Sequence, residues 1–570
     1  MKTITKAVML VLAAAAGVAQ AEWSLDKRPN VPPPAAPNSK EPAAPEGYPV
    51  EKMDFPITPG PFEPTWDSIK KNYPGTPEWL HEAKFGVFIH WGPQAYGRSG
   101  DWYARRLYSE GENSYNNHLK NFGHPSEFGY KDVLNDWKAP KWDPVLLTKA
   151  FHDAGIRFVM AIGVHHDNYD MWDSKYNPWN AAEVGPKKDM IGAWKREAAK
   201  NGMRFGITFH HEYNWWWFQT AFGSDTKGPK AGVPYDGHLT LEDGKGKWWE
   251  GRDPRLLYGI DIREYNDVAN IPFTRKGIFQ DHQEYARWYA TWWAKRIQDA
   301  VEKYDPDMIY TDGNGSGPFC GHNSGSGYKS DAGPRVVADF YNTALKRRGK
   351  VDTLAAIKWV PNNPAIGVTQ ENTVPSGIVN DKPWIGENPI GDWYYGPGYC
   401  YDPINLVRSL LEYSSRGGAY ACAIPITPEG DLEPACHDML KEIGAWMRIH
   451  NEGIYGSKSW KTWGQGEVVQ AGKLDHKTAA LPFTANDIRF TQGKNGKLYA
   501  WCMAVPKPGQ KITISALGTD AKLLESDIAS VEVVGSEAKL DWQQSAAGLE
   551  VTFPQDVTGK LVLGLRVSLK

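Results

Sequence analysis

The stretch that decides the fold is Arg157-Phe-Val-Met-Ala-Ile-Gly-Val164, followed at once by His165-His-Asp-Asn-Tyr-Asp-Met-Trp172. The first part is a short continuous apolar run, which predicts a fully buried strand. The second part is crowded with imidazoles, carboxylates and rings, and polar groups at a strand end need partners or solvent. A buried strand that ends in this way predicts a parallel sheet whose strand ends carry a site.

Seven further strand-like stretches lie on either side of this strand and alternate with helical patterns, although those at 367–371 and 383–390 are the weakest in pattern. The clearest helix is predicted at 282–303, where Trp and Tyr residues recur at spacings of three and four. Strands that alternate with helices favour a parallel α/β fold, and eight strands are the number that a closed (β/α)8-type barrel needs. The eight predicted strands are 85–92, 157–166, 204–211, 307–313, 353–360, 367–371, 383–390 and 419–427.

The rest of the chain divides around this barrel, which we predict to span 65–454. Residues 22–64 are rich in proline and predict an arm or linker. Residues 455–570 contain short alternating runs separated by turns, such as 497–502, 549–553 and 560–563, which are typical of an antiparallel β-sandwich. A long insertion at 218–280 follows the third strand, so a barrel would place it at the C-terminal face, where it could shape a site.

The start of the chain has the composition of a secretory signal peptide. Basic residues precede an apolar run that is too short to span a bilayer, and Ala19-Gln-Ala21 is a small-residue cleavage site. We therefore expect cleavage after Ala21 and a secreted or periplasmic protein, with no transmembrane helix later in the chain. Five widely spaced cysteines form no metal-ligand pattern and no dense disulfide framework.

The overall composition limits the kinds of partner. A net charge of −3 argues against nucleic acid or an anionic membrane as the main partner. The 26 tryptophans and 27 tyrosines fit large aromatic cores, and they also fit a carbohydrate groove, where rings stack on the apolar face of a sugar. Rings mixed with hydrogen-bonding side chains suit a pyranose, because its edges carry hydroxyl groups. A carbohydrate is the partner that we expect.

Several predicted strands end in similar chemistry. In a barrel these strand ends converge on one face, which is where the active sites of that fold lie. The candidate residues at or just beyond strand ends are His90, Trp91, Asp101, Trp102, His165, His166, His210, Trp215, Tyr310, Asp312, Glu371, Glu387 and Trp393.

A metal centre is the alternative from another class of protein. Possible ligands follow the second and third strands: His165, His166, Asp167, His210, His211 and Glu212. Adjacent histidines on a strand point to opposite faces, so at most one of each pair would enter the barrel mouth unless the strand ends between them. The chain contains neither a His-x-His nor a His-Glu-x-x-His spacing. We therefore expect neither a metal nor an organic cofactor.

Four segments in the right order resemble the α-L-fucosidases of glycoside hydrolase family 29. Trp79–Gly92 looks like the first barrel strand of that family, and His165–Tyr176 resembles its second-strand motif. Asp307–Gly313 is similar to the strand that carries the family's nucleophile, and Gly417–Gly430 resembles the segment that closes the barrel. The resemblance covers about 65–456.

This resemblance implies a retaining exo-glycosidase, which uses two carboxyl groups, one as nucleophile and one as acid/base. The nucleophile position corresponds to Asp312. The family positions that hold the sugar correspond to His90, Trp91, His165, His166 and His210.

The chain departs from the family pattern at several positions. Many members carry the acid/base in a Trp-Glu pair, but here Trp384 is followed by Ile385. We prefer Glu387 as the acid/base and keep Glu371 as the second candidate. The other replacements are Asp101-Trp102 for Glu-Trp, Tyr310 for Trp and Lys358-Trp359 for Arg-Trp. A lysine cannot reproduce a bidentate arginine contact.

The prediction is a secreted exo-acting enzyme that releases α-L-fucose through a covalent glycosyl intermediate. Two alternatives remain open. The departures above would fit a related exo-glycosidase acting on another galacto-configured or sulfated sugar of a polysaccharide. If the acid/base was lost at Ile385, the chain would be a carbohydrate-binding homologue with impaired catalysis.

Overall fold

The computed structural model describes residues 23–29, 50–212, 214, 217–261, 283–312, 329–358, 363–468, 472–473, 481–557 and 559–570. The signal peptide, about half of the predicted arm, the end of the insertion (262–280) and Trp215 lie outside these residues, so their predictions stay predictions. Among the described residues, no helix is long and apolar enough to cross a membrane.

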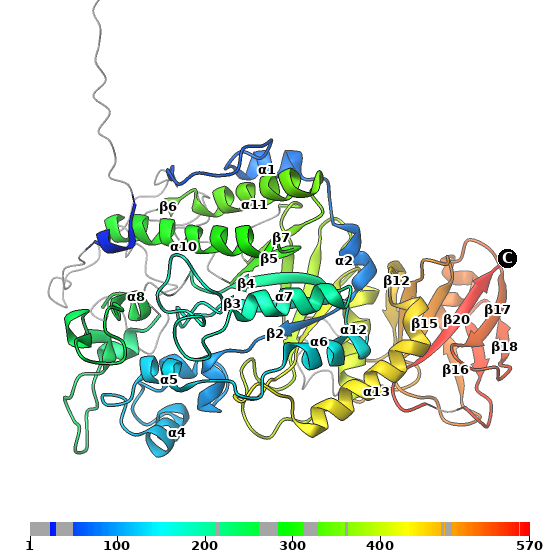
Figure 1. Cartoon of the computed structure of the whole chain (residues 1–570). Coiled ribbons are helices and arrows are strands. Elements are labelled where there is room, and N and C mark those ends of the chain that lie inside the picture. Colours follow the sequence, from blue (N-terminus) through cyan, green and yellow to red (C-terminus); the bar gives the residue numbers. More distant parts are fainter. Residues whose placement is uncertain are drawn as a thin grey trace, which may run out of the picture.

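A ring of eight parallel strands forms the centre of the molecule (Figure 1). Its order is β7-β5-β4-β3-β2-β11-β10-β8. The ends of this order meet at a parallel bridge between Ala356 and Gly367, where the Gly367 N–H donates to the Ala355 carbonyl at 2.8 Å. All eight predicted strands are confirmed: β2 (Phe85–Ile89), β3 (Phe158–Val164), β4 (Arg204–Phe209), β5 (Met308–Thr311), β7 (Leu354–Ile357), β8 (Val368–Glu371), β10 (Trp384–Pro389) and β11 (Ala419–Ala423).

Helices cover the outside of the ring, and the predicted helix at 282–303 is α10. The alternation of strand and helix is incomplete, however. In the described part of the chain, no helix separates β7 from β8, and β8 and β10 are joined through β9 (Thr373–Val374). The helices are α1 (Trp66–Asn72), α2 (Glu78–Ala83), α3 (Tyr103–Arg106), α4 (Asn113–Phe122), α5 (Tyr130–Asp136), α6 (Pro144–Asp153), α7 (Met190–Lys200), α8 (Arg255–Tyr258), α10 (Gln283–Tyr304), α11 (Ala332–Arg348), α12 (Pro403–Ser415) and α13 (Pro434–His450).

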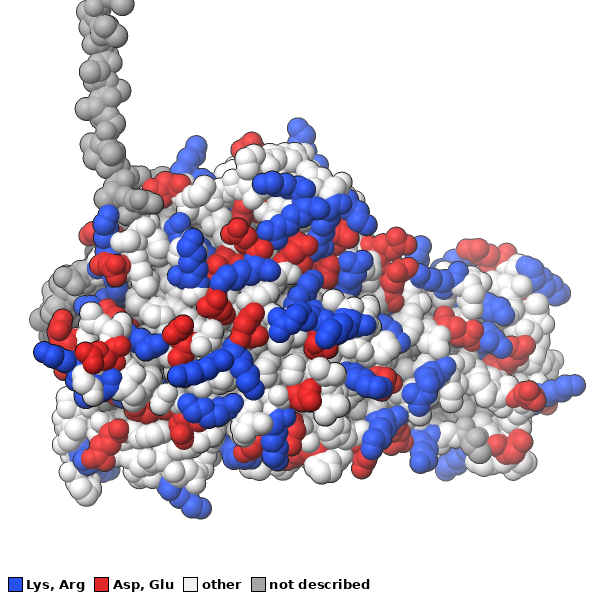
Figure 2. Space-filling model, viewed as in Figure 1, with Lys and Arg blue, Asp and Glu red and all other residues white. Residues whose placement is uncertain are grey.

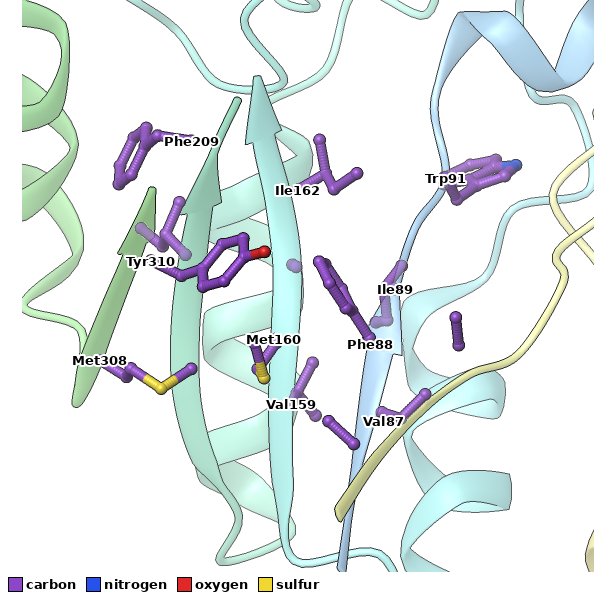
Figure 3. Packing of buried hydrophobic residues seen from close by; sticks show 14 of the residues in the cluster. Val87, Phe88, Ile89, Trp91, Val159, Met160, Ile162, Phe209, Met308 and Tyr310 are labelled. Carbon is purple, nitrogen blue, oxygen red and sulfur yellow. The ribbon is translucent and has the colours of Figure 1, made fainter. Parts of the chain in front are cut away.

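The barrel interior is packed with side chains and is not a pore. Every residue of β3 is buried, as its continuous apolar run predicts. Figure 3 shows Phe88 and Tyr310 pointing toward one another across the interior, with Met160 nearby. The rings of Phe88 and Tyr310 meet edge to face, 6.0 Å apart. This packing closes the lower part of the barrel and leaves space only near the strand ends.

The C-terminal part consists of two antiparallel sheets with a hydrophobic core of their own. One sheet has the order β12-β14-β15-β20-β17, and the other β16-β19-β18. The predicted antiparallel β-fold is confirmed, although the sequence patterns missed β12 and β18. The last strand was also misplaced, because only Leu563 of the run 560–563 belongs to it. The strands are β12 (Lys458–Gln465), β14 (Ile488–Gln492), β15 (Leu498–Cys502), β16 (Lys511–Ile514), β17 (Ile528–Val533), β18 (Asp541–Gln544), β19 (Leu549–Thr552) and β20 (Leu563–Leu569).

A buried ionic cluster joins these sheets to the barrel. Glu412 on α12 accepts hydrogen bonds from Arg489 on β14, at 2.8 Å from Nε and 2.6 Å from Nη2. The second oxygen of Glu412 pairs with Arg416. All three side chains are at most 1% exposed, so the negative charge of Glu412 is shared by two buried guanidinium groups.

We expect Glu412→Gln to destabilise the protein by about 3–5 kcal/mol, because it removes the buried negative charge that pairs with two buried guanidinium groups. The measurement is urea denaturation monitored by tryptophan fluorescence. Asp438→Asn is the control, since the Asp438–Lys441 pair is more than 70% exposed on both sides and such pairs contribute at most ~1 kcal/mol. Equal effects of the two substitutions would contradict the role of the cluster.

Candidate active site

A cavity of about 270 Å³ opens among the C-terminal ends of the barrel strands. This volume is at the small end of the range for ligand pockets, which suits one small ring better than a long polymer. The cavity is lined by Phe88, His90, Asp101, Trp102, His165, His166, His210, Tyr310, Asp312, Lys358, Glu371, Glu387 and Trp393.

The histidine pair after β3 enters this cavity with both members. Strand β3 ends at Val164, so His165 and His166 are free of the alternation that a strand imposes. After β4, in contrast, only His210 lines the cavity, whereas His211 Nε2 lies 3.2 Å from the Trp293 carbonyl on α10.

The acids that follow the pair after β3 hold the segment in place. Asp167 accepts a hydrogen bond from the Tyr130 hydroxyl at 2.6 Å. Asp170 pairs with Arg296 of α10 in a completely buried contact. These partners explain why a buried strand can end in so many polar groups.

The imidazoles of the cavity wall are neutral near pH 7. Burial, together with neighbouring histidines, lowers the pKa of His90 and of His165 well below the usual value. Burial lowers the pKa of His166 to about 3, even though Asp312 lies nearby. Among the described residues, neither ring nitrogen of His90 has a hydrogen-bond partner. His90 therefore offers a donor and an acceptor to a bound molecule.

Asp312, which directly follows β5, is held in its ionised form. Its carboxylate oxygens lie 3.1 Å from Lys358 Nζ and 3.2 Å from His210 Nδ1. Burial works to raise the pKa of Asp312, but Lys358 and the two neighbouring histidines keep it well below the ordinary value. The carboxylate is thus a base or nucleophile at neutral pH.

Lys358, just beyond β7, also contacts the two candidate glutamates. Its ammonium group lies 2.6 Å from Glu371 Oε2 and 3.9 Å from Glu387 Oε1. The two glutamates are register partners on neighbouring strands. Glu371 is the last residue of β8 and its side chain is 40% exposed, whereas Glu387 lies inside β10 and is 1% exposed.

Burial raises the pKa of Glu387 to about 8, helped by the charges of Glu371 and Asp312 and opposed by Lys358. Its Oε1 accepts a hydrogen bond from the Tyr310 hydroxyl at 3.1 Å. The cavity thus contains one carboxyl group that is ionised and one that is protonated at neutral pH.

Two tryptophan rings, those of Trp102 and Trp393, line the cavity beside the histidines. Trp102 adopts a left-handed backbone conformation (φ 63°), and its ring meets that of His166 edge to face. Trp393 lies against His90, with ring centroids 5.1 Å apart. The carboxylate of Asp101 is 3.8 Å from His165 Nε2, and burial beside Asp392 raises the pKa of Asp101 well above its usual value.

The structure does not bring Trp91 into the cavity. Its indole N–H donates to the Thr427 carbonyl at 2.9 Å, and its ring packs against Trp137. Figure 3 shows it on the outer side of the chain that continues from β2. His90 turns inward and its neighbour therefore turns outward, which the motif alone did not indicate.

Two residues near the cavity escaped the sequence-based reasoning. Phe88 lines its floor, because alternation along β2 places it on the same side as His90. Gln94 contacts His165 Nδ1 at 2.6 Å and fixes the orientation of that ring. The alternation rule could have identified Phe88, whereas no sequence signal marks Gln94.

Three histidines of this wall could also hold a metal ion. Ligand atoms of His165, His166 and His210 lie within 4.8 Å of one another. The ammonium group of Lys358 lines the same cavity, and its charge helps to lower the pKa of all three histidines. A fixed positive charge there opposes the binding of a cation.

Comparisons with known proteins agree with this architecture. A family model for α-L-fucosidases matches residues 51–452, and a model for the α-L-fucosidase C-terminal domain matches residues 482–566. The tissue α-L-fucosidase of Rattus norvegicus is 22% identical over 88% of this chain and 90% of its own length. An α-L-fucosidase of Branchiostoma floridae is 23% identical over 88% of this chain and 93% of its own length.

Solved structures show the same fold. The Thermotoga maritima α-fucosidase in complex with fucose covers 89% of this chain and 100% of its own, with a TM-score of 0.62 at 21% identity. A GH29 α-L-fucosidase from Bacteroides thetaiotaomicron covers 91% and 98%, with a TM-score of 0.57 at 14% identity. Since the family model spans most of the chain, this protein belongs to the α-L-fucosidase family, glycoside hydrolase family 29.

Proposed function

We propose that this protein is an exo-acting, retaining α-L-fucosidase. The observation that carries the proposal is the group of three carboxyl groups around one ammonium, Lys358 Nζ, in a cavity walled by neutral histidines and rings. Retaining hydrolysis needs two neighbouring carboxyl groups with different roles. The small volume of the cavity supports an exo mode of action, because it has room for about one terminal sugar.

Asp312 is the nucleophile in this proposal. Its low pKa keeps the carboxylate charged, and its position directly after β5 puts it at the level where barrel active sites lie. It attacks the anomeric carbon while the leaving-group oxygen takes a proton from the acid. A glycosyl ester forms, and water activated by the same acid/base group then hydrolyses it.

Glu371 is the better acid/base on the geometry, which reverses the order preferred from the sequence. The acid must reach the glycosidic oxygen, and that oxygen lies toward the mouth because the leaving group departs through it. Glu371 ends its strand and is 40% exposed, whereas Glu387 is enclosed within β10. When Asp312 forms the glycosyl ester it loses its negative charge, and Glu371 has by then given its proton to the leaving-group oxygen, so Lys358 is placed to stabilise the Glu371 carboxylate.

Asp312→Asn is expected to lower kcat for an aryl α-L-fucoside by ~10³-fold or more, since the neutral amide cannot form the glycosyl ester. The measurement is steady-state release of the phenol. Asp167→Asn is the control, because Asp167 is a buried acid bonded to Tyr130 and does not line the cavity. Unchanged hydrolysis by Asp312→Asn would refute the mechanism.

Glu371→Gln is expected to slow a fucoside with a poor leaving group by ~10²–10⁴-fold. A nitrophenyl fucoside should be affected much less, because its leaving group needs little protonation. The rates are compared over a series of phenols of increasing pKa. A steep dependence on leaving-group pKa in Glu387→Gln, with none in Glu371→Gln, would assign the acid role to Glu387 instead.

We also propose that the protein is exported. The support is the composition of residues 1–21, with its basic start, apolar run and Ala-Gln-Ala site. N-terminal sequencing of the protein expressed in a bacterial host with an intact export pathway should give Glu22 as the first residue. Retention of Met1 in that preparation would contradict export.

A further inference from the structure

The proposed mechanism leaves Glu387 without a role, although it is the most deeply buried acid of the cavity. Its carboxyl group lines the cavity and is 1% exposed. One oxygen accepts the hydrogen bond from Tyr310. The other oxygen, Oε2, is buried and has no hydrogen-bond partner among the described residues.

Such an oxygen is costly to keep. A buried polar group without a partner destabilises a protein by ~1–3 kcal/mol, so each one in a native structure calls for an explanation. Phe88 and Tyr310 line the same cavity as Glu387, and neither gives Oε2 a hydrogen bond. Because Glu387 lines the cavity, a molecule bound there can supply the missing partner after a small movement of the side chain.

The ionisation state of Glu387 defines what that partner must be. Burial keeps the group protonated at neutral pH, with a pKa of about 8. Tyr310 donates to Oε1, so the carboxyl proton lies on Oε2 and is available to donate. A carboxylic acid in this position pairs with a neutral group that can accept a hydrogen bond, and a sugar hydroxyl is such a group.

We propose that Glu387 and Tyr310 form a receptor for one hydroxyl group of the sugar in the cavity and thereby determine specificity. This inference rests on the proposed function, since it concerns the same cavity. The pair selects sugars that carry a hydroxyl at the contacted carbon. A sugar with hydrogen at that carbon leaves Oε2 unpaired, and sites built to bind a hydroxyl discriminate strongly against such analogues.

The experiment compares kcat/KM for aryl α-L-fucoside, its 2-, 3- and 4-deoxy analogues, and aryl α-L-galactoside, which adds a hydroxyl at C6. For the wild-type protein, kcat/KM should depend strongly on the presence of a hydroxyl group at one carbon of this series. Glu387→Leu should reduce that one preference at least ~10-fold and leave the others unchanged. Tyr310→Phe should reduce the same preference, because it loses only the hydroxyl that orients Glu387.

Tyr420→Phe is the matched control. Tyr420 lies on the neighbouring strand β11, is equally buried, and donates to Asn388 Oδ1 at 2.6 Å outside the cavity. It should leave every preference unchanged. A circular dichroism melt establishes that each variant is folded, and Tyr310→Phe keeps the comparison decisive if Glu387→Leu does not fold.

A uniform loss of kcat/KM across all sugars in both variants would overturn the inference, as would an effect that follows the leaving group rather than the sugar. Calorimetric binding of the free sugars gives the same comparison without turnover. Absence of hydrolysis by the wild-type protein would therefore contradict the proposed function, while the selectivity of binding would still decide the role of Glu387 and Tyr310.

Discussion

The closed ring of parallel strands is the constraint on which the centre of this protein depends. All eight strands run in one direction, so their C-terminal ends meet at one mouth. The ring closes at the Ala356–Gly367 bridge. Without that closure, Lys358 after β7 and Glu371 at the end of β8 would belong to opposite edges of an open sheet. The contact between Lys358 and Glu371 therefore depends on the closure of the ring as well as on the opposite charges of the two side chains.

Within the mouth, one cation sets the charge states of its neighbours. Lys358 stabilises the ionised form of Asp312, while the enclosed position of Glu387 keeps that acid neutral. The two carboxyl groups thus differ in charge because they differ in burial and in distance from Lys358, and not because one is an aspartate and the other a glutamate. Lysine suits this arrangement, since its compact charge can lie among three acceptors, whereas a guanidinium presents a flat, directional fork.

The fold was readable from the sequence because its signals are local. Most barrel strands are short apolar runs, with β8 as the exception, and four motifs in order pointed to the family. The missing helices around β8 and the outward turn of Trp91 were readable in principle, since the predicted strands 353–360, 367–371 and 383–390 leave only short gaps and alternation places Trp91 opposite His90. The two candidate acids could be named from the sequence, but the order preferred there is the reverse of the one that the geometry favours, because exposure at the mouth depends on strand length, and β8 ends at Glu371 while β10 continues past Glu387.

Charged residues of both signs are interspersed over the visible face of the molecule (Figure 2), which fits the small net charge. The buried Glu412–Arg489 contact stands apart from these surface charges. It ties the C-terminal sheets to α12, which packs against β11 in the barrel wall. The sequence pattern changes near residue 455, but shortening the chain there would remove contacts on which the barrel wall depends. A protein shortened there would keep Glu412 and Arg416 but lose Arg489, and its barrel wall would face water with an apolar surface designed for contact.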